Sequence, residues 1–61
     1  MPYSYECDAY GGVTLYDKDT GEDVYMQGDD AESFLNSIGG DCDGYYDEDA
    51  LEDIAPEYFG E

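Results

Sequence analysis

The sequence of 61 residues has no arginine, no histidine and no tryptophan, and Lys18 is its single basic side chain. Its eighteen Asp and Glu residues give a formal net charge of −17 at pH 7. A polyanion of this density is repelled by nucleic acid and by anionic membrane surfaces, so direct binding to either is excluded. Without histidine, few side chains change charge near neutral pH.

Large aliphatic residues are also scarce. Leu, Ile, Val and Phe total nine of the 61 residues, below the roughly 20% that, together with high charge, signals disorder. Eight tyrosines compensate, because each can bury on the order of 150–250 Å² and keep its hydroxyl in water. A core this small stabilises a fold by only about 3–5 kcal/mol, and repulsion between like charges reduces that margin. We expect one small domain over residues 1–61.

The two cysteines, Cys7 and Cys42, have neither the spacing of a metal knuckle nor that of a CxxC redox pair. The segment Met1–Glu6 lacks the basic region and apolar run of a secretory signal, and no stretch approaches the length of a membrane span. In a chain without an export signal, we expect the two thiols to be reduced rather than joined in one disulfide.

Three segments have the composition of β-strands. Tyr3–Ala9 is rich in aromatic residues, Val13–Tyr16 alternates in polarity, and Glu22–Met26 follows a short polar stretch. That stretch, Asp17–Gly21, has the Asp and Gly residues of a tight turn. The second and third segments are therefore predicted to form a hairpin.

Alternation along this hairpin predicts which side chains are buried. Val13 and Leu15 should face Val24 and Met26 on the buried side. The opposite side should carry Thr14, Tyr16 and Tyr25.

A short helix is predicted after Gly28. Asp29 and Glu32 have the spacing of a capping box, with Asp29 as the N-cap. Gly39 is the expected residue just past the helix end. One apolar stripe at helical spacing is formed by Ala31, Phe34, Leu35 and Ile38.

A second helix is predicted over Glu48–Ala55, capped by Asp47 and ended by Pro56. Its narrow apolar face consists of Leu51, Ile54 and Ala55. Tyr58 and Phe59 should fold back onto the core as a hydrophobic tail. The expected fold class is α+β, with a small three-stranded antiparallel sheet and one or two short helices.

The acidic residues cluster at the hairpin turn, at the start of the first helix, and along the second helix with its preceding loop. Acids at a helix start interact favourably with the helix dipole, which accounts for Asp29, Asp30, Asp47 and Glu48. It does not account for Glu52 and Asp53, which form like-charge i,i+4 pairs with Glu48 and Asp49. Each such pair costs roughly 0.2–0.5 kcal/mol. A merely solvated surface would intersperse lysines among the acids.

Duplex DNA has a comparable charge density. At one phosphate per ~1.7 Å of axis, seventeen charges span ~29 Å, and a compact chain of this length has a diameter of about 27 Å. Acids at i,i+4 on a helix lie ~5–6 Å apart at Cβ, similar to neighbouring phosphates. A rigid set of carboxylates can thus occupy a basic groove built for nucleic acid.

Tyrosine is too abundant for so small a core, and we expect about half of the eight to be available at an interface, where tyrosine is enriched. Tyr45 and Tyr46, in the acidic loop, are the best pair for this role, although packing under the second helix is an equal alternative. We predict these partner-binding residues: Asp17, Asp19, Glu22, Asp23, Asp29, Asp30, Asp43, Tyr45, Tyr46, Asp47, Glu48, Asp49, Glu52 and Asp53.

Metal binding and catalysis are not expected. Placing Gly44 at position six of an EF-hand loop puts Ala50 at position twelve, and placing Asp17 at position one puts Glu22 where glycine belongs, so no specific calcium site is predicted. Paired carboxylates need a cleft that separates their pKa values, and the cysteines lack a histidine to activate them. We expect no enzyme activity, no metal and no cofactor.

Small, very acidic, tyrosine-rich chains with almost no lysine or arginine resemble the DNA-mimic inhibitors of phages and mobile elements. These include uracil-DNA glycosylase inhibitors, anti-restriction proteins and anti-CRISPR proteins. The segment from Val13 to Leu35, a hairpin followed by a helix, resembles short phage accessory proteins, among them small anti-CRISPR proteins.

The resemblance implies a monomeric, stoichiometric inhibitor in the cytoplasm of a bacterial host. It would block the basic DNA-binding channel of a CRISPR effector complex. From the acidic clusters themselves, we expect the second helix and its loop to be the main contact and the hairpin turn to be the next. Two alternatives remain. One is mimicry directed at another target, such as a uracil-DNA glycosylase, a restriction enzyme or a histone-like protein. The other is a small acidic domain adapted to high salt.

Overall fold

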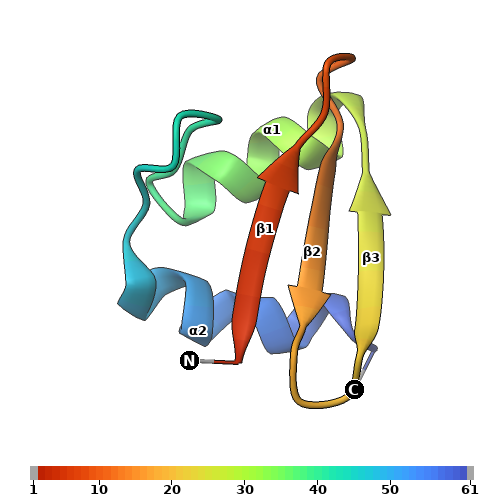
Figure 1. The fold of residues 1–61 in the computed structure, drawn as a ribbon. Coiled ribbons are helices and arrows are strands. Elements are labelled where there is room, and N and C mark those ends of the chain that lie inside the picture. Colours follow the sequence, from red (N-terminus) through yellow and green to blue (C-terminus); the bar gives the residue numbers. More distant parts are fainter. Residues whose placement is uncertain (1, 61) are drawn as a thin grey trace.

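The computed structural model describes residues 2–60 and shows an α+β fold, as the sequence predicts (Figure 1). The Cα radius of gyration is 10.4 Å and the longest extent is 26 Å, in agreement with the compact size expected from chain length. The elements, in chain order, are β1 (Tyr3–Cys7), β2 (Val13–Asp17), β3 (Glu22–Met26), α1 (Gly28–Ser37) and α2 (Glu48–Tyr58).

The three strands form one antiparallel sheet in the order β1-β2-β3. In β2–β3, Val13 pairs with Met26 and Leu15 pairs with Val24, so the predicted hairpin and its register are confirmed. The first strand ends at Cys7 rather than Ala9. It ends there because the chain turns back, with the Asp8 N–H donating to the Gly12 carbonyl at 2.9 Å.

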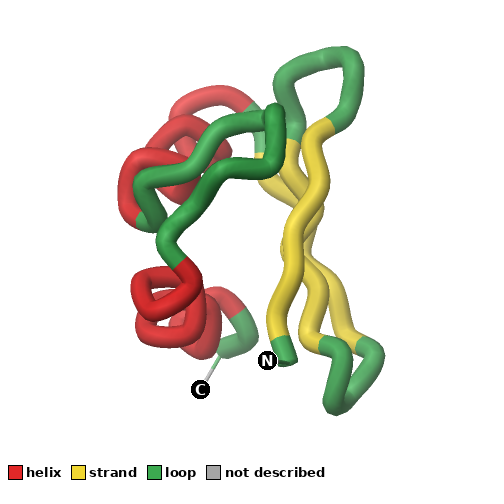
Figure 2. The backbone as a smooth tube through the Cα atoms, turned by 60° about the vertical axis from the view of Figure 1, so that its left-hand side comes forward, coloured by secondary structure: helices red, strands yellow, loops and turns green. Residues whose placement is uncertain are grey.

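Both helices pack on one face of the sheet, and no helix of residues 2–60 lies on the other face (Figure 2). Phe34 is fully buried between these layers, with its ring edge-to-face to Tyr5 and to Tyr58 at centroid distances of 5.7 and 5.4 Å. The buried core consists of Val13, Leu15, Met26, Ala31, Phe34, Ile38, Leu51 and Ala55. The predicted stripe and apolar face thus supply most of it, with Leu35 and Ile54 at its margin.

The predicted capping box of α1 is wrong. The N-cap is Gln27, which makes no side-chain cap hydrogen bond, and Asp29 already lies in the first turn. The helix starts early because β3 ends at Met26 and only one extended residue separates the two elements. The predicted end is confirmed: Gly39 has φ +60°, and the N–H groups of Gly39 and Gly40 donate to carbonyls of the last turn at 3.2 and 2.8 Å.

The cap of α2 is confirmed, since the Asp47 side chain accepts from the backbone of the first turn. Its predicted end at Ala55 is wrong, because the helix continues through Pro56 to Tyr58. Pro56 has no N–H to donate to the Glu52 carbonyl, so the added turn costs one helical hydrogen bond. Packing holds this turn, since Tyr58 contacts Phe34 and the Phe59 ring stacks on Tyr3 at 6.0 Å. The tail therefore folds onto the core as predicted.

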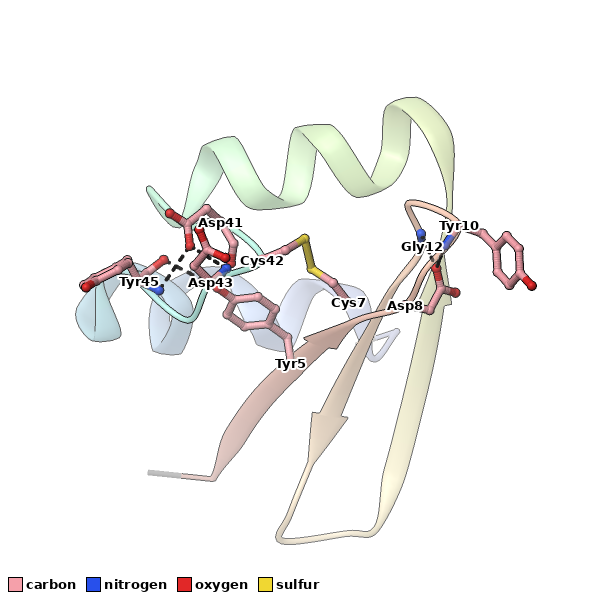
Figure 3. Close-up of a disulfide and its surroundings, with 9 residues drawn as sticks. All are labelled: Tyr5, Cys7, Asp8, Tyr10, Gly12, Asp41, Cys42, Asp43 and Tyr45. Carbon is pink, nitrogen blue, oxygen red and sulfur yellow. Dashed lines mark hydrogen bonds between the residues drawn. A yellow bond between two sulfur atoms is a disulfide. The ribbon is translucent and has the colours of Figure 1, made fainter.

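The expectation of reduced thiols is also wrong, because Cys7 and Cys42 form a disulfide (Figure 3). The bond joins the end of β1 to the loop between the helices. Their Cα atoms lie 5.6 Å apart, within the range that a disulfide requires. A separation of 35 residues gives no sign of this proximity in the sequence. It arises because α1 crosses the sheet and delivers its following loop to the end of β1.

We predict that replacing both cysteines with serine lowers the free energy of unfolding by about 3–4 kcal/mol. This is the chain-entropy value for a closed loop with a separation of 35 residues. The loss is close to the whole ~3–5 kcal/mol that a core of this size supplies. Urea unfolding followed by circular dichroism measures it, and adding a reductant to the wild-type chain should reproduce the effect. An unchanged midpoint in both experiments would contradict a stabilising disulfide.

Candidate functional site

Four aspartates hold the turns of the chain through their own carboxylates. Asp8 Oδ1 accepts from the backbone N–H of Tyr10 and of Gly12, both at 2.8 Å. Asp17, Asp41 and Asp47 each accept from the N–H two residues further on, at 2.9, 2.9 and 3.0 Å. Such local bonds are typical of Asp in turns and at helix starts. Two predicted partner-binding residues, Asp17 and Asp47, therefore also shape the backbone.

The fold brings the hairpin turn close to α2. Tyr3 pairs with Asp17 in the sheet, and the Phe59 ring, just past α2, stacks on the Tyr3 ring at 6.0 Å. Desolvation raises the pKa of the Tyr3 hydroxyl, and the negative charges of Asp17, Glu52 and Asp19 raise it further. Glu22 and Asp23 line a shallow hollow together with Tyr58, at the C-terminal end of α2. The C-terminal end of α2 and the hairpin, which are far apart in the sequence, thus lie side by side.

Along α2 the acids do not all point the same way. Glu48, Asp49 and Asp53 are exposed, whereas Glu52 is half-buried and its Oε2 atom is buried without a hydrogen-bond partner. Glu57 is exposed and follows Asp53 at i,i+4. Sequence reasoning missed Glu57 because it ended the helix at Ala55; its helical spacing was the available signal.

The exposed acids of these two regions are called the α2–hairpin surface from here on. Its members are Asp19, Glu22, Glu48, Asp49, Asp53 and Glu57, whereas Asp23 alternates with Val24 and faces the other side of the sheet. Asp29 and Asp30 are exposed but do not belong to it. They lie in the first turn of α1, beyond the far end of β3 from the hairpin turn (Figure 1).

The loop between the helices places its two tyrosines differently. Tyr45 is 75% exposed, and Tyr46 is 37% exposed with its ring edge-to-face to Tyr5 at 5.4 Å. The Asp41 carboxylate fixes the loop by accepting from the N–H of Asp43 and of Tyr45, at 2.9 and 3.2 Å (Figure 3). Asp43 itself is exposed. Tyr45 is therefore the freer of the two predicted anchors, and Tyr46 partly belongs to the packing of the loop.

Tyr5 connects this loop to the sheet. Its hydroxyl donates to the Asp41 carbonyl at 2.7 Å, close to the disulfide (Figure 3). Burial raises the pKa of Tyr5, and the nearby charge of Asp41 raises it further. This tyrosine is a structural residue, not an interface anchor.

Within residues 2–60, no group of three or more Cys, Asp or Glu side chains is arranged to hold a metal ion. No helix in the same part of the chain is long and apolar enough to cross a bilayer. Both cysteine sulfurs are bonded to each other. The arrangement offers a dense, outward-facing set of carboxylates with exposed tyrosines beside it.

We predict that Asp47→Ala lowers the free energy of unfolding by about 1 kcal/mol, within the 0.5–2 kcal/mol typical of a lost N-cap. The cap bonds to Asp49 and Ala50 are lost in this variant. Asp47→Asn is the matched control, since Asn caps as well as Asp but removes the charge. Urea unfolding distinguishes the two. Equal destabilisation in both variants would show that the charge, not the cap, is what matters.

No protein-family model matches the chain, and no curated protein or solved structure matches it either. Charge, shape and surface chemistry are therefore the features that bear on what this protein does.

Proposed function

We propose that this protein is a stoichiometric inhibitor that mimics DNA phosphates and blocks the basic DNA-binding channel of a CRISPR effector complex. The observation that carries the proposal is charge density. A net charge of −17 is held on a body 26 Å long, and a DNA duplex of that length carries about 15 phosphates. The choice of a CRISPR effector within the wider class of targets follows the resemblance to small anti-CRISPR proteins.

The geometry of the α2–hairpin surface supports this role. Asp49, Asp53 and Glu57 form one exposed row at i,i+4 along α2, and such neighbours lie ~5–6 Å apart at Cβ. A helix holds them rigidly, so little entropy is lost when arginines and lysines of a target bind them. Charge-assisted hydrogen bonds and release of counterions from the target supply the affinity.

The rest of the surface supports a binding role rather than a catalytic one. Three hollows on the described part of the chain are open to solvent, and loop, helix-end and strand residues line them. The sequence has no histidine that could activate Cys7 or Cys42 as a nucleophile. The proposed site of action is the bacterial cytoplasm, with the protein as a monomer. Thiol reductants act on the disulfide there, and binding to a target would offset the lost stability by mass action.

The two alternatives give different results in one experiment. The chain is used to capture proteins from a bacterial lysate, and duplex DNA is then added as a competitor. A mimic of DNA releases its target to the duplex, whichever DNA-binding protein that target is. A domain adapted to high salt captures nothing and requires molar salt to fold.

We predict that reversing two charges, Asp49→Lys with Asp53→Lys, weakens target binding on the order of 100-fold. Each lost charge-assisted contact is worth about 1.5 kcal/mol, and two give about 3 kcal/mol, or roughly 100-fold. Glu52 is left in place because its side chain is half-buried. Titration calorimetry with the captured target measures the change.

The matched control is Asp29→Lys with Asp30→Lys, which makes the same change in net charge away from the α2–hairpin surface. Circular dichroism verifies that both variants are folded. We expect the control to bind within a few-fold of wild type. If the two double variants bind equally, the contact surface is misassigned and only overall charge matters.

We also predict that affinity for the captured target falls roughly tenfold or more between about 50 and 200 mM salt, because the partner's charged groups dominate binding. Repeating the titration at several salt concentrations gives the slope. The Asp49→Lys/Asp53→Lys variant should have a shallower slope, since it makes fewer ionic contacts. An affinity that does not change with salt would be incompatible with phosphate mimicry.

A further inference from the structure

The face of the sheet turned away from the helices has a chemistry of its own. The strand register places Thr14 between Glu6 on β1 and Tyr25 on β3, and it places Tyr16 between Ser4 and Asp23. This open sheet face is opposite the side on which α1 and α2 pack (Figure 2). It consists of Ser4, Glu6, Thr14, Tyr16, Asp23 and Tyr25.

Tyr25 is fixed across this face although it is 52% exposed. Its hydroxyl donates to Asp8 Oδ2 at 2.8 Å and accepts from Gln27 Nε2 at 3.2 Å. To reach Asp8, the side chain passes directly over Gly12, where a Cβ atom would lie 2.2 Å from the hydroxyl oxygen. Glycine at position 12 therefore makes room for this crossing.

Tyr16 is fixed in the same way. Its hydroxyl donates to Glu6 Oε1, 3.1 Å away on the neighbouring strand. Both rings thus have their polar ends occupied by a carboxylate, and a partner that contacts them does not have to order them first. A side chain that is already ordered loses less entropy on binding.

The carboxylates on and beside this face are Glu6, Asp8 and Asp23, and none of the six face residues is a cation. Hydrogen bonds from Gly12, Tyr10 and Tyr25, in that order, lower the pKa of Asp8. Fixed tyrosine rings beside carboxylates suit a guanidinium group. Its planar cation can lie over an aromatic ring while its N–H groups donate to the neighbouring acids.

We propose that the open sheet face is a second binding surface, which takes arginine side chains displayed by a protein partner. A second copy of this chain is a poor occupant, because both copies carry a charge of −17. The proposal does not rest on phosphate mimicry by the α2–hairpin surface, since the two surfaces lie on opposite sides of the sheet. It would stand if α2 bound nothing.

The test uses the full chain, labelled with ¹⁵N and titrated with a short glycine peptide that carries two arginines. The same peptide with two lysines is the comparison. We expect amide shifts concentrated at Glu6, Thr14, Tyr16 and Tyr25, and binding of the arginine peptide about threefold tighter or more. Equal binding of the two peptides, or shifts spread evenly over all acidic residues, would overturn the proposal.

Variants separate this surface from general charge attraction. Tyr16→Leu should weaken binding of the arginine peptide about threefold to tenfold. Tyr45→Leu, a change at an exposed tyrosine off the face, should leave it unchanged. Thr14→Lys places a competing cation at the centre of the face and should abolish binding, whereas Thr14→Gln should not.

The amide spectrum of each variant verifies its fold. The Asp49→Lys/Asp53→Lys variant should bind the arginine peptide within about twofold of wild type, so the two proposals can fail separately. The proposal is wrong if the Tyr16 and Tyr45 variants lose equal affinity, or if Thr14→Lys binds as Thr14→Gln does.

Discussion

Repulsion among the carboxylates is the constraint that the rest of this structure has to satisfy. Within residues 2–60, eight buried hydrophobic residues oppose the repulsion of a chain with net charge −17, and the Cys7–Cys42 bond adds a covalent restraint between the sheet and the loop that joins the helices. The bond is well placed, because it closes the side of the molecule where the chain between α1 and α2 has no regular structure. Tyr5 reinforces the same junction by its bond to Asp41 and its contact with Phe34.

Not all of the acidic residues destabilise the fold. Asp8, Asp17, Asp41 and Asp47 each satisfy backbone N–H groups at a turn or helix start. At those positions a negative charge lowers the free energy of the fold instead of raising it. Apart from the half-buried Glu52, the remaining acids of residues 2–60 face outward, most densely along α2 and the hairpin turn. This division explains how so anionic a chain still forms a defined sheet and two helices.

The layered arrangement gives the molecule two unlike sides. Helix α2 presents carboxylates at regular spacing, whereas the uncovered face of the sheet presents tyrosines whose hydroxyls are bound to carboxylates. A row of isolated charges suits a cationic groove that normally holds phosphates. Rings beside acids suit a planar cation. The two proposals made above follow from these different chemistries, and each side can act without the other.

The sequence by itself determined the local elements. Alternation along Val13–Tyr16 and Glu22–Met26 defined the hairpin, helical spacing from Ala31 to Ile38 defined α1, and Gly39 marked its end. These features depend on contacts within a few residues, which a linear pattern encodes. The charge and the compact size were equally readable, because both follow from composition and length.

Only the tertiary structure decided the rest: the Cys7–Cys42 pairing, the inward turn of Glu52, the extension of α2 to include Glu57, and the anchoring of Tyr16 and Tyr25 across the sheet. Each of these features depends on which elements lie side by side, and the way the helices cross the sheet decides that. The residues involved are too far apart in the sequence for a local pattern to predict their contact.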